Sequence, residues 1–340
     1  SGIVEHLGYV REVAASRDKF NRDRRLLESC IEADPSDLYS HYKLMEQARY
    51  WEDTALWADI AAKTAQLLER STQDDVRAYH FCAEMVCLTV NGLYPTDYEG
   101  AYRWLHPWMH PANRSPVLAY WMGYFCEQTQ RLQHAKEHYL RCLDLPAARD
   151  KQMGAVRPLM GLCRLSLFQG DLNAAATWTQ KALAINPADD EVIVAARAMA
   201  DTYISDGFGQ LAANLMAPLA GHPPQGPDGI TQGRALLLAG KPQEAKDVVI
   251  QLVKELPEAG IGVLVCNLCM GEHTDLELDI SQEDADIALR AWVHTALRSQ
   301  NQEVAVTFCD TAGLITGIFP WLEGYVIEML GGAQDDQPTP

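Results

Sequence analysis

The chain has 340 residues, of which 48% are hydrophobic, and it carries 46 acidic against 28 basic side chains, a net charge of −18 at pH 7. This much apolar material excludes a chain that is disordered throughout. The acidic balance argues against nucleic acid as a partner, because phosphate recognition needs a concentrated basic face. No apolar run reaches the length of about 18 residues that a membrane span requires. Nine cysteines without framework spacing indicate reduced thiols and a cytoplasmic location.

The N-terminal residues predict a short junction segment, residues 1–18, before the first helix. Ser1 is not an initiator Met, and the basic and then apolar pattern of a secretory signal does not follow it. We therefore expect a trimmed chain or a fragment of a longer one. A helix is expected over Leu26–Ala33, ended by the Asp34-Pro35 break.

Residues 170–187 form the clearest repeat. Gly170 provides a tight turn, Ala175 and Ala182 lie seven residues apart on one helix face, and Pro187 ends the helix. This pattern resembles the second half of a tetratricopeptide repeat, a helix–turn–helix unit of about 34 residues. The same offsets recur over residues 39–62, 123–146 and 233–257, and more weakly over 74–109 and 196–220.

The sequence therefore predicts an all-α fold, a tetratricopeptide-like helical-repeat solenoid that winds as a right-handed superhelix. We expect the array over residues 19–257, an atypical acidic helical cap over 258–330 and a disordered tail over 331–340. The apolar run Gly260–Met270 is compatible with a helix or a strand. The remaining helices of the cap are expected over Asp284–Ser299, with Leu289 and Trp292 inward, over Glu303–Ile315 and over Leu322–Leu330.

The negative charge is concentrated towards the C-terminal end. Residues 258–340 hold 14 acidic and two basic side chains, a net charge of −12, and the first 257 residues account for −6. A solvated end of an open solenoid explains this distribution. A docking surface for a basic partner is the alternative.

The opening residues also resemble a known junction. Residues 3–9, with His6-Leu7-Gly8-Tyr9, and the segments 19–28 and 33–39 are similar to a region of bacterial family 2 glycosyltransferases that carry C-terminal tetratricopeptide repeats. In that family the catalytic domain ends in a His-x-Gly-Tyr segment, with which His6 aligns. Arg24 stands where an Asn is common. The resemblance covers roughly the first 60 residues and implies that the chain is the C-terminal module of a glycosyltransferase-like protein.

Such transferases bind a nucleotide-sugar and a divalent metal through an N-terminal α/β domain with an Asp-x-Asp-type motif. Asp284-Ala285-Asp286 matches the letters of that motif, but it begins a predicted helix, where carboxylates suit the helix dipole. We therefore expect a non-catalytic chain. The alternative is part of an active nucleotide-sugar-dependent glycosyltransferase whose catalytic domain lies upstream of Ser1.

Other candidate chemistry is sparse. Cys266 and Cys269 with His273 make only half of a zinc pattern, and prolines separate His106 from His110. The sequence contains no phosphate-binding loop and no nucleophile elbow. We expect no catalytic residue, no metal site and no cofactor.

Helical-repeat arrays bind partners in a concave groove that the first helix of each pair lines. By analogy with tetratricopeptide repeats, the groove positions of the first units are Gln47, His80 and Glu84. Those that follow are Tyr120, Tyr124, Glu127, Arg157, Arg164, Arg197 and Arg234. Arginines there could bind a carboxylate or phosphate, and the tyrosines could stack on a side chain or sugar. Alternatively, each arginine pairs with an acidic neighbour.

The function predicted from the sequence is that of a binding scaffold. Its partner would be a protein, a peptide or a glycan acceptor held in the groove, or a second copy of the chain. Phe319 and Trp321 are the residues expected to make the contact in a homo-oligomer.

Overall fold

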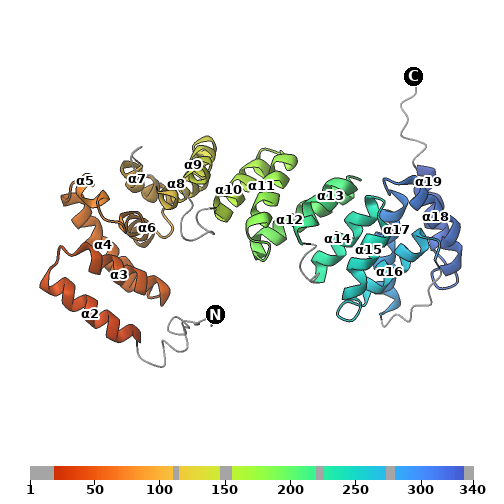
Figure 1. Ribbon diagram of the computed structural model, residues 1–340, viewed down its shortest axis with the longest axis horizontal. Helices are drawn as coiled ribbons and strands as arrows, with labels where there is room; N and C mark the ends of the chain where they lie inside the picture. Colours follow the sequence, from red (N-terminus) through yellow and green to blue (C-terminus); the bar gives the residue numbers. More distant parts are fainter. Residues whose placement is uncertain (1–18, 110–114, 146–154, 220–225, 273–279, 333–340) are drawn as a thin grey trace, which may run out of the picture. The chain divides into compact units, whose positions relative to one another are not determined.

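A computed structural model of the chain (Figure 1) describes residues 19–109, 115–145, 155–219, 226–272 and 280–332. These residues form helices joined by short turns and contain no strand, which confirms the all-α prediction. The chain divides into two compact units, residues 1–165 and 166–340. The predicted junction segment 1–18 lies outside the described residues.

In the first unit, helices that follow one another in the chain pack side by side, α3 with α4 and α8 with α9. The helices of this unit (Figure 1) are α2 (Lys19–Ala33), α3 (Leu38–Tyr50), α4 (Thr54–Arg70), α5 (Gln73–Arg77), α6 (Cys82–Leu93), α7 (Tyr98–Leu105), the 3-10 turn η2 (His106–Trp108), α8 (Pro116–Gln128), α9 (Leu132–Asp144) and α10 (Arg157–Phe168), which continues into the second unit.

The second unit repeats this arrangement, with α12 packed on α13 and α14 on α15. Its elements are α11 (Leu172–Ile185), α12 (Asp190–Ser205), α13 (Gly209–Met216), η4 (Ala217–Leu219), α14 (Gly226–Leu238), α15 (Pro242–Val249), η5 (Ile250–Leu252), α16 (Glu258–Cys269), α17 (Gln282–Leu297), α18 (Gln302–Ala312), η6 (Gly313–Ile315) and α19 (Leu322–Gly332). No helix in the described ranges is both long and apolar enough to cross a membrane. Sequential pairing of helices is what a helical-repeat solenoid requires.

One turn geometry recurs between the two helices of a pair. A residue with positive φ is followed by an amide that donates to the carbonyl five residues earlier, as the amide of Asp171 does to Ser166 at 2.9 Å. This is the six-to-one hydrogen bond of the Schellman motif, which ends a helix and reverses the chain. The positive-φ residues of these turns are Glu52, Gln130, Gly170, Gly207 and Gly240. The repeat seen in the sequence is therefore a repeat of backbone geometry, even where glycine is absent.

Aspartates begin many of these helices. The side chains of Asp53, Asp97 and Asp171 cap second helices of a pair, and Asp37 and Asp189 cap first helices; each accepts a hydrogen bond from a backbone amide of the first turn. Such a cap contributes about 1 kcal/mol to stability. Part of the acidic composition thus serves helix formation.

Small residues let the paired helices approach closely. Ala135, Ala175 and Ala245 are each the fourth residue of a second helix, and all three are completely buried. In the α3–α4 pair the equivalent position of the second helix is Trp57. Its indole nitrogen donates to the carbonyl of Leu88 at 3.0 Å. Ala175 and Ala182, predicted from the sequence to allow close packing, are both completely buried.

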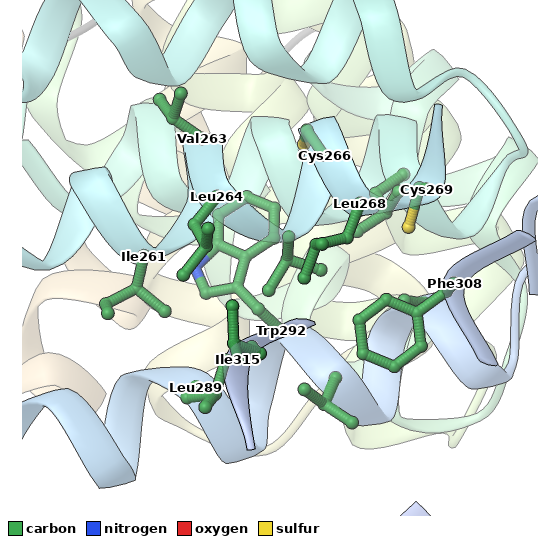
Figure 2. Packing of buried hydrophobic residues seen from close by; sticks show 14 of the residues in the cluster. Ile261, Val263, Leu264, Cys266, Leu268, Cys269, Leu289, Trp292, Phe308 and Ile315 are labelled. Carbon is green, nitrogen blue, oxygen red and sulfur yellow. The ribbon is translucent and has the colours of Figure 1, made fainter. Parts of the chain in front are cut away.

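Trp292 of α17 lies in the core of the second unit, with 2% of its surface exposed (Figure 2). Ile261, Leu264 and Leu268 of α16 surround it with Leu289. Ala259 to Cys269 of α16 are all buried. A helix that is buried on every side shows no amphipathic period, which is why its sequence is equally compatible with a strand.

The C-terminal helices agree with the sequence predictions in position. The run Gly260–Met270 is helical as far as Cys269, and Leu289 and Trp292 are buried as expected. Helix α19 extends to Gly332, just past the expected start of the tail at residue 331. Phe319 is only 2% exposed, so it packs in the core of the second unit rather than on a surface that a second copy would meet.

The two units differ strongly in charge. The first holds 20 basic and 22 acidic residues, a net charge of −2, whereas the second holds eight and 24, a net charge of −16. Within the second unit, residues 166–257 carry a net charge of −4 and residues 258–340 carry −12, so most of the negative charge lies towards the C-terminal end.

Candidate binding site

An open hollow of about 260 Å³ lies in the first unit, between α6, the α6–α7 connection, α8 and the start of α10. This volume is below the range of roughly 300–1,000 Å³ typical of sites for drug-sized ligands, and it suits a single ring or side chain. Most of its described lining is aromatic: Asn91, Tyr94, Pro95, Tyr98, Tyr120, Trp121, Tyr124, Phe125 and Arg157. We call it the aromatic hollow.

Helix α8 supplies one wall. Tyr120, Trp121, Tyr124 and Phe125 are spaced so that they share one side of the helix. The ring centroids of Trp121 and Tyr124 lie 5.6 Å apart at 89°, and those of Trp121 and Phe125 lie 5.7 Å apart at 30°. Phe125 and Tyr120 are buried, while Trp121 and Tyr124 are half-buried. Trp121 and Tyr124 therefore keep part of their surface exposed in the lining of the hollow.

The α6–α7 connection supplies the opposite wall. Asp97 caps α7 by accepting the amide hydrogen of Gly100 at 2.8 Å, which places Tyr98 at the first position of the helix. The ring of Tyr94 lies against Gly100, where an added Cβ would come within 2.7 Å of its Cδ1. The absence of a side chain at Gly100 therefore lets Tyr94 rest on the first turn of α7.

Tyr98 and Tyr124 join the two walls. Their rings meet edge to face, with centroids 5.9 Å apart at 89°. Burial, and then the hydrogen bond to Tyr98, raise the pKa of Tyr124 to about 12. Its hydroxyl therefore stays protonated and uncharged at neutral pH.

Two further groups give the hollow its polar character. The side-chain nitrogen of Asn91 donates to the carbonyl of Cys87 at 2.8 Å, which orients its carbonyl oxygen as an acceptor. Arg157 is exposed at the first turn of α10 and forms no ion pair with any residue that the structure describes. Asp, Glu, His and Cys are all missing from the described lining. These residues thus offer ring faces, hydroxyls and one positive charge.

Tyr139 of α9 holds α8 and α10 in place. Its ring lies between Gly123 and Gly161, where added Cβ atoms would come within 2.7 Å of its Cδ1 and 2.5 Å of its Cζ. Its hydroxyl donates to Glu127 at 2.6 Å, and Arg164 donates to both oxygens of the same carboxylate. Burial, together with the negative charge of Glu127, raises the pKa of Tyr139 far above its usual value. The helices that carry Tyr124 and Arg157, α8 and α10, are therefore joined through Tyr139 and Glu127.

The residues predicted for the groove take different places. Tyr120, Tyr124 and Arg157 come together in the aromatic hollow. Glu127 and Arg164 form an ion pair with each other and are not among its described lining residues. In the second unit, Arg197 pairs with Asp228 at 2.9 Å. Arg234 is half-buried, its Nε donates to the hydroxyl of Thr295 at 3.3 Å, and burial lowers its pKa.

Gln47, His80 and Glu84, the groove positions predicted in the first repeats, are not among the described residues that line the hollow. Sequence reasoning in turn missed most of its walls: Asn91, Tyr94, Pro95, Tyr98, Trp121 and Phe125. One available signal was the density of aromatic residues, since nine of the 28 in the chain fall within residues 94–125. Density alone, however, does not tell a buried ring from an accessible one.

The candidate metal-binding patterns take structural roles. Cys266 and Cys269 lie buried in α16, where burial raises the pKa of Cys266 to about 12. Asp284 accepts the hydroxyl of Ser281 at 2.6 Å, and Asp286 accepts the indole N–H of Trp321 at 3.0 Å. His110 and His273 lie outside the described residues. Within those residues, no group of three or more His, Cys, Asp or Glu side chains is arranged to hold a metal ion.

No protein-family model matches the chain, and no curated protein sequence matches it either. The resemblance to family 2 glycosyltransferases is therefore carried by the sequence motifs alone. The geometry establishes an all-helical, repeat-like fold that is compatible with the tetratricopeptide class.

Proposed function

We propose that the protein is a helical-repeat binding module that holds part of an extended partner, a peptide or a glycan, in the aromatic hollow of its first unit. The observation that carries this proposal is the hollow itself, where two tyrosine-bearing walls enclose a space of about 260 Å³ beside an arginine with no described ion-pair partner. Such a combination of ring faces with a few polar groups is typical of binding pockets.

The proposal includes a tetratricopeptide-like right-handed superhelix, with residues 258–330 as its cap. The recurring Schellman turns and the sequential packing of helix pairs support this assignment. In such an array the first helix of each pair faces the partner. Tyr120, Trp121 and Tyr124 belong to the first helix of the α8–α9 pair, and Arg157 lies at the start of α10, the next helix in the chain.

Binding to arrays of defined peptides and defined oligosaccharides tests the proposal. We expect the labelled protein to bind a related set of peptides or glycans, and Trp121→Ala to abolish this binding. Trp178→Ala is the matched control, because Trp178 is a half-buried tryptophan of the second unit with Lys181 over its ring. Circular dichroism confirms that both variants are folded.

Two results would contradict the proposal. One is the absence of any reproducible ligand on both arrays. The other is a ligand whose binding is weakened equally by Trp121→Ala and by Trp178→Ala. Equal losses would mean that the ligand is not held in the hollow that Trp121 lines.

A further inference from the structure

The aromatic hollow differs in charge from the rest of the protein. The chain has 46 acidic side chains, yet none of the described lining residues is acidic and one of them, Arg157, is basic. Arg157 is exposed and has no ion-pair partner among the residues described. By contrast, Arg164 and Arg197 are both held by carboxylates. Arg157 is thus the one charged side chain of the described lining, and its guanidinium group favours an anionic ligand over a cationic one.

The lining is also unusual in its side-chain chemistry. Apart from Pro95, the lining residues that the structure describes include no aliphatic side chain; they offer rings, hydroxyls, an amide and a guanidinium group. A pocket for a leucine or valine side chain of a peptide would be expected to contain aliphatic partners of matching shape. Half-buried rings beside tyrosine hydroxyls suit a different kind of ligand, one that has an apolar face and a polar edge.

A pyranose ring has that form. Its axial C–H bonds make an apolar face that stacks on an aromatic ring, and its hydroxyls form a rim of donors and acceptors. In the hollow, Trp121 and Tyr124 are the partly exposed aromatic side chains of α8. The hydroxyls of Tyr94 and Tyr98 and the carbonyl oxygen of Asn91 provide partners for the rim.

We propose that the aromatic hollow binds an acidic pyranose, a sugar ring that carries a carboxylate, as one residue of an anionic polysaccharide. Trp121 stacks on the ring, and Arg157 binds the carboxylate through its guanidinium fork. This inference rests on the proposed binding function and names the ligand class for the same site. A volume of about 260 Å³ is consistent with one sugar residue at a time.

Calorimetric titration of the full chain with trigalacturonate, and with a hyaluronan tetrasaccharide that contains glucuronate, tests the inference. Saturable binding of either probe supports it. The methyl ester of trigalacturonate is the matched neutral ligand, because it keeps the rings and removes the charge. We expect it to bind at least about tenfold more weakly, as the loss of one charged hydrogen-bonded pair implies.

Variants then locate the binding. Arg157→Ala is expected to weaken binding of the acidic probe by about tenfold or more, and Arg157→Lys by less, since an ammonium group retains the charge without the fork. Lys136→Ala removes an exposed charge from α9 and is expected to leave affinity unchanged. Added salt should weaken binding to the wild type more than to Arg157→Ala.

The outcomes separate this inference from the proposed function. If the methyl ester binds as tightly as the acid, or if neither acidic probe binds while an acidic peptide binds and depends on Trp121, the acidic-sugar assignment is wrong and the binding module stands. If the acidic probe binds but Arg157→Ala and Lys136→Ala weaken it equally, the assignment is also wrong. If no probe, sugar or peptide, depends on Trp121, both proposals are wrong.

Discussion

Arg164 holds both carboxylate oxygens of Glu127, from Nε to Oε1 at 2.7 Å and from Nη2 to Oε2 at 3.1 Å. The hydroxyl of Tyr139 donates to the same carboxylate at 2.6 Å. One carboxylate of α8 therefore joins α9 and α10. The Glu127 side chain is only 13% exposed, so the hydrogen bonds are partly shielded from water and each is stronger than at the surface.

Removal of this carboxylate should destabilise the first unit. We expect Glu127→Ala to lower the free energy of unfolding by about 2 kcal/mol, because it removes the carboxylate that the Tyr139 hydroxyl and the Arg164 guanidinium group share. Tyr139→Phe removes one hydrogen bond and should cost about 1 kcal/mol. Urea denaturation with hydrogen exchange of α8 and α9 measures both. Asp59→Ala, which breaks an exposed pair with Lys63, is the control; an equal loss there would show that the buried network has no special role.

The contact of Tyr139 with Gly123 gives a second prediction. Alanine normally favours a helix over glycine by about 1 kcal/mol. At position 123, however, the new methyl group would lie 2.7 Å from the Tyr139 ring, which is completely buried. We expect Gly123→Ala to lower the free energy of unfolding by about 1–3 kcal/mol, as other overpacked cores do, measured by urea denaturation.

Gly324 of α19 is the matched control for this substitution. No atom lies within 4 Å of the Cβ that alanine would add there. Gly324→Ala should therefore be neutral or stabilise the protein by up to about 1 kcal/mol. If both substitutions stabilise, Tyr139 moves freely and the packing described for α8 and α9 is wrong.

A substitution at Gly170 measures the stability cost of backbone strain without any contribution from side-chain crowding. Its φ is +75°, and an added Cβ would meet nothing within 4 Å. Any cost of Gly170→Ala therefore comes from the left-handed backbone conformation, and we expect about 1 kcal/mol. Gly170→Asn should cost less, because asparagine tolerates this conformation better. The melting temperatures of the two variants measure the difference; equal melting temperatures would argue against the Schellman turn.

The sequence predicted the helical array because the repeat depends on local features. Gly170, Ala175 and Pro187 each act within one helix–turn–helix unit, so their spacing carries the information. Helix α16 could not be assigned from its pattern, since its residues are buried on all sides and have no polar face.

The candidate site was only partly predictable, because it depends on contacts distant in the chain. Arg164 and Arg197 occupy expected groove positions, yet their partners Glu127 and Asp228 lie 37 and 31 residues away. Nothing local in the sequence identifies those pairs. Similarly, Tyr98 belongs to the hollow through its contact with Tyr124, which a helical period within α8 does not reveal.

His138 of α9 makes the stability of the first unit depend on pH. Burial, followed by the positive charge of Arg141 and the neighbouring His134, lowers its pKa from 6.5 to about 4. The unfolded chain therefore binds a proton at a higher pH than the folded chain. As pH falls from about 6.5 to about 4, protonation favours the unfolded state, and the contribution of His138 to stability is lost over this window.

We expect His138→Gln to remove this part of the pH dependence. Below pH 6.5 the free energy of unfolding of the wild type should fall more steeply than that of the variant, until about pH 4, where the two slopes become equal. Urea denaturation at a series of pH values gives both curves, and their difference cancels the titration of carboxylates that they share. His80→Gln changes an exposed histidine of the same unit and should follow the wild-type curve. Parallel curves for His138→Gln and the wild type would mean that His138 is protonated as readily in the folded chain as in the unfolded one, and that α9 does not bury its imidazole.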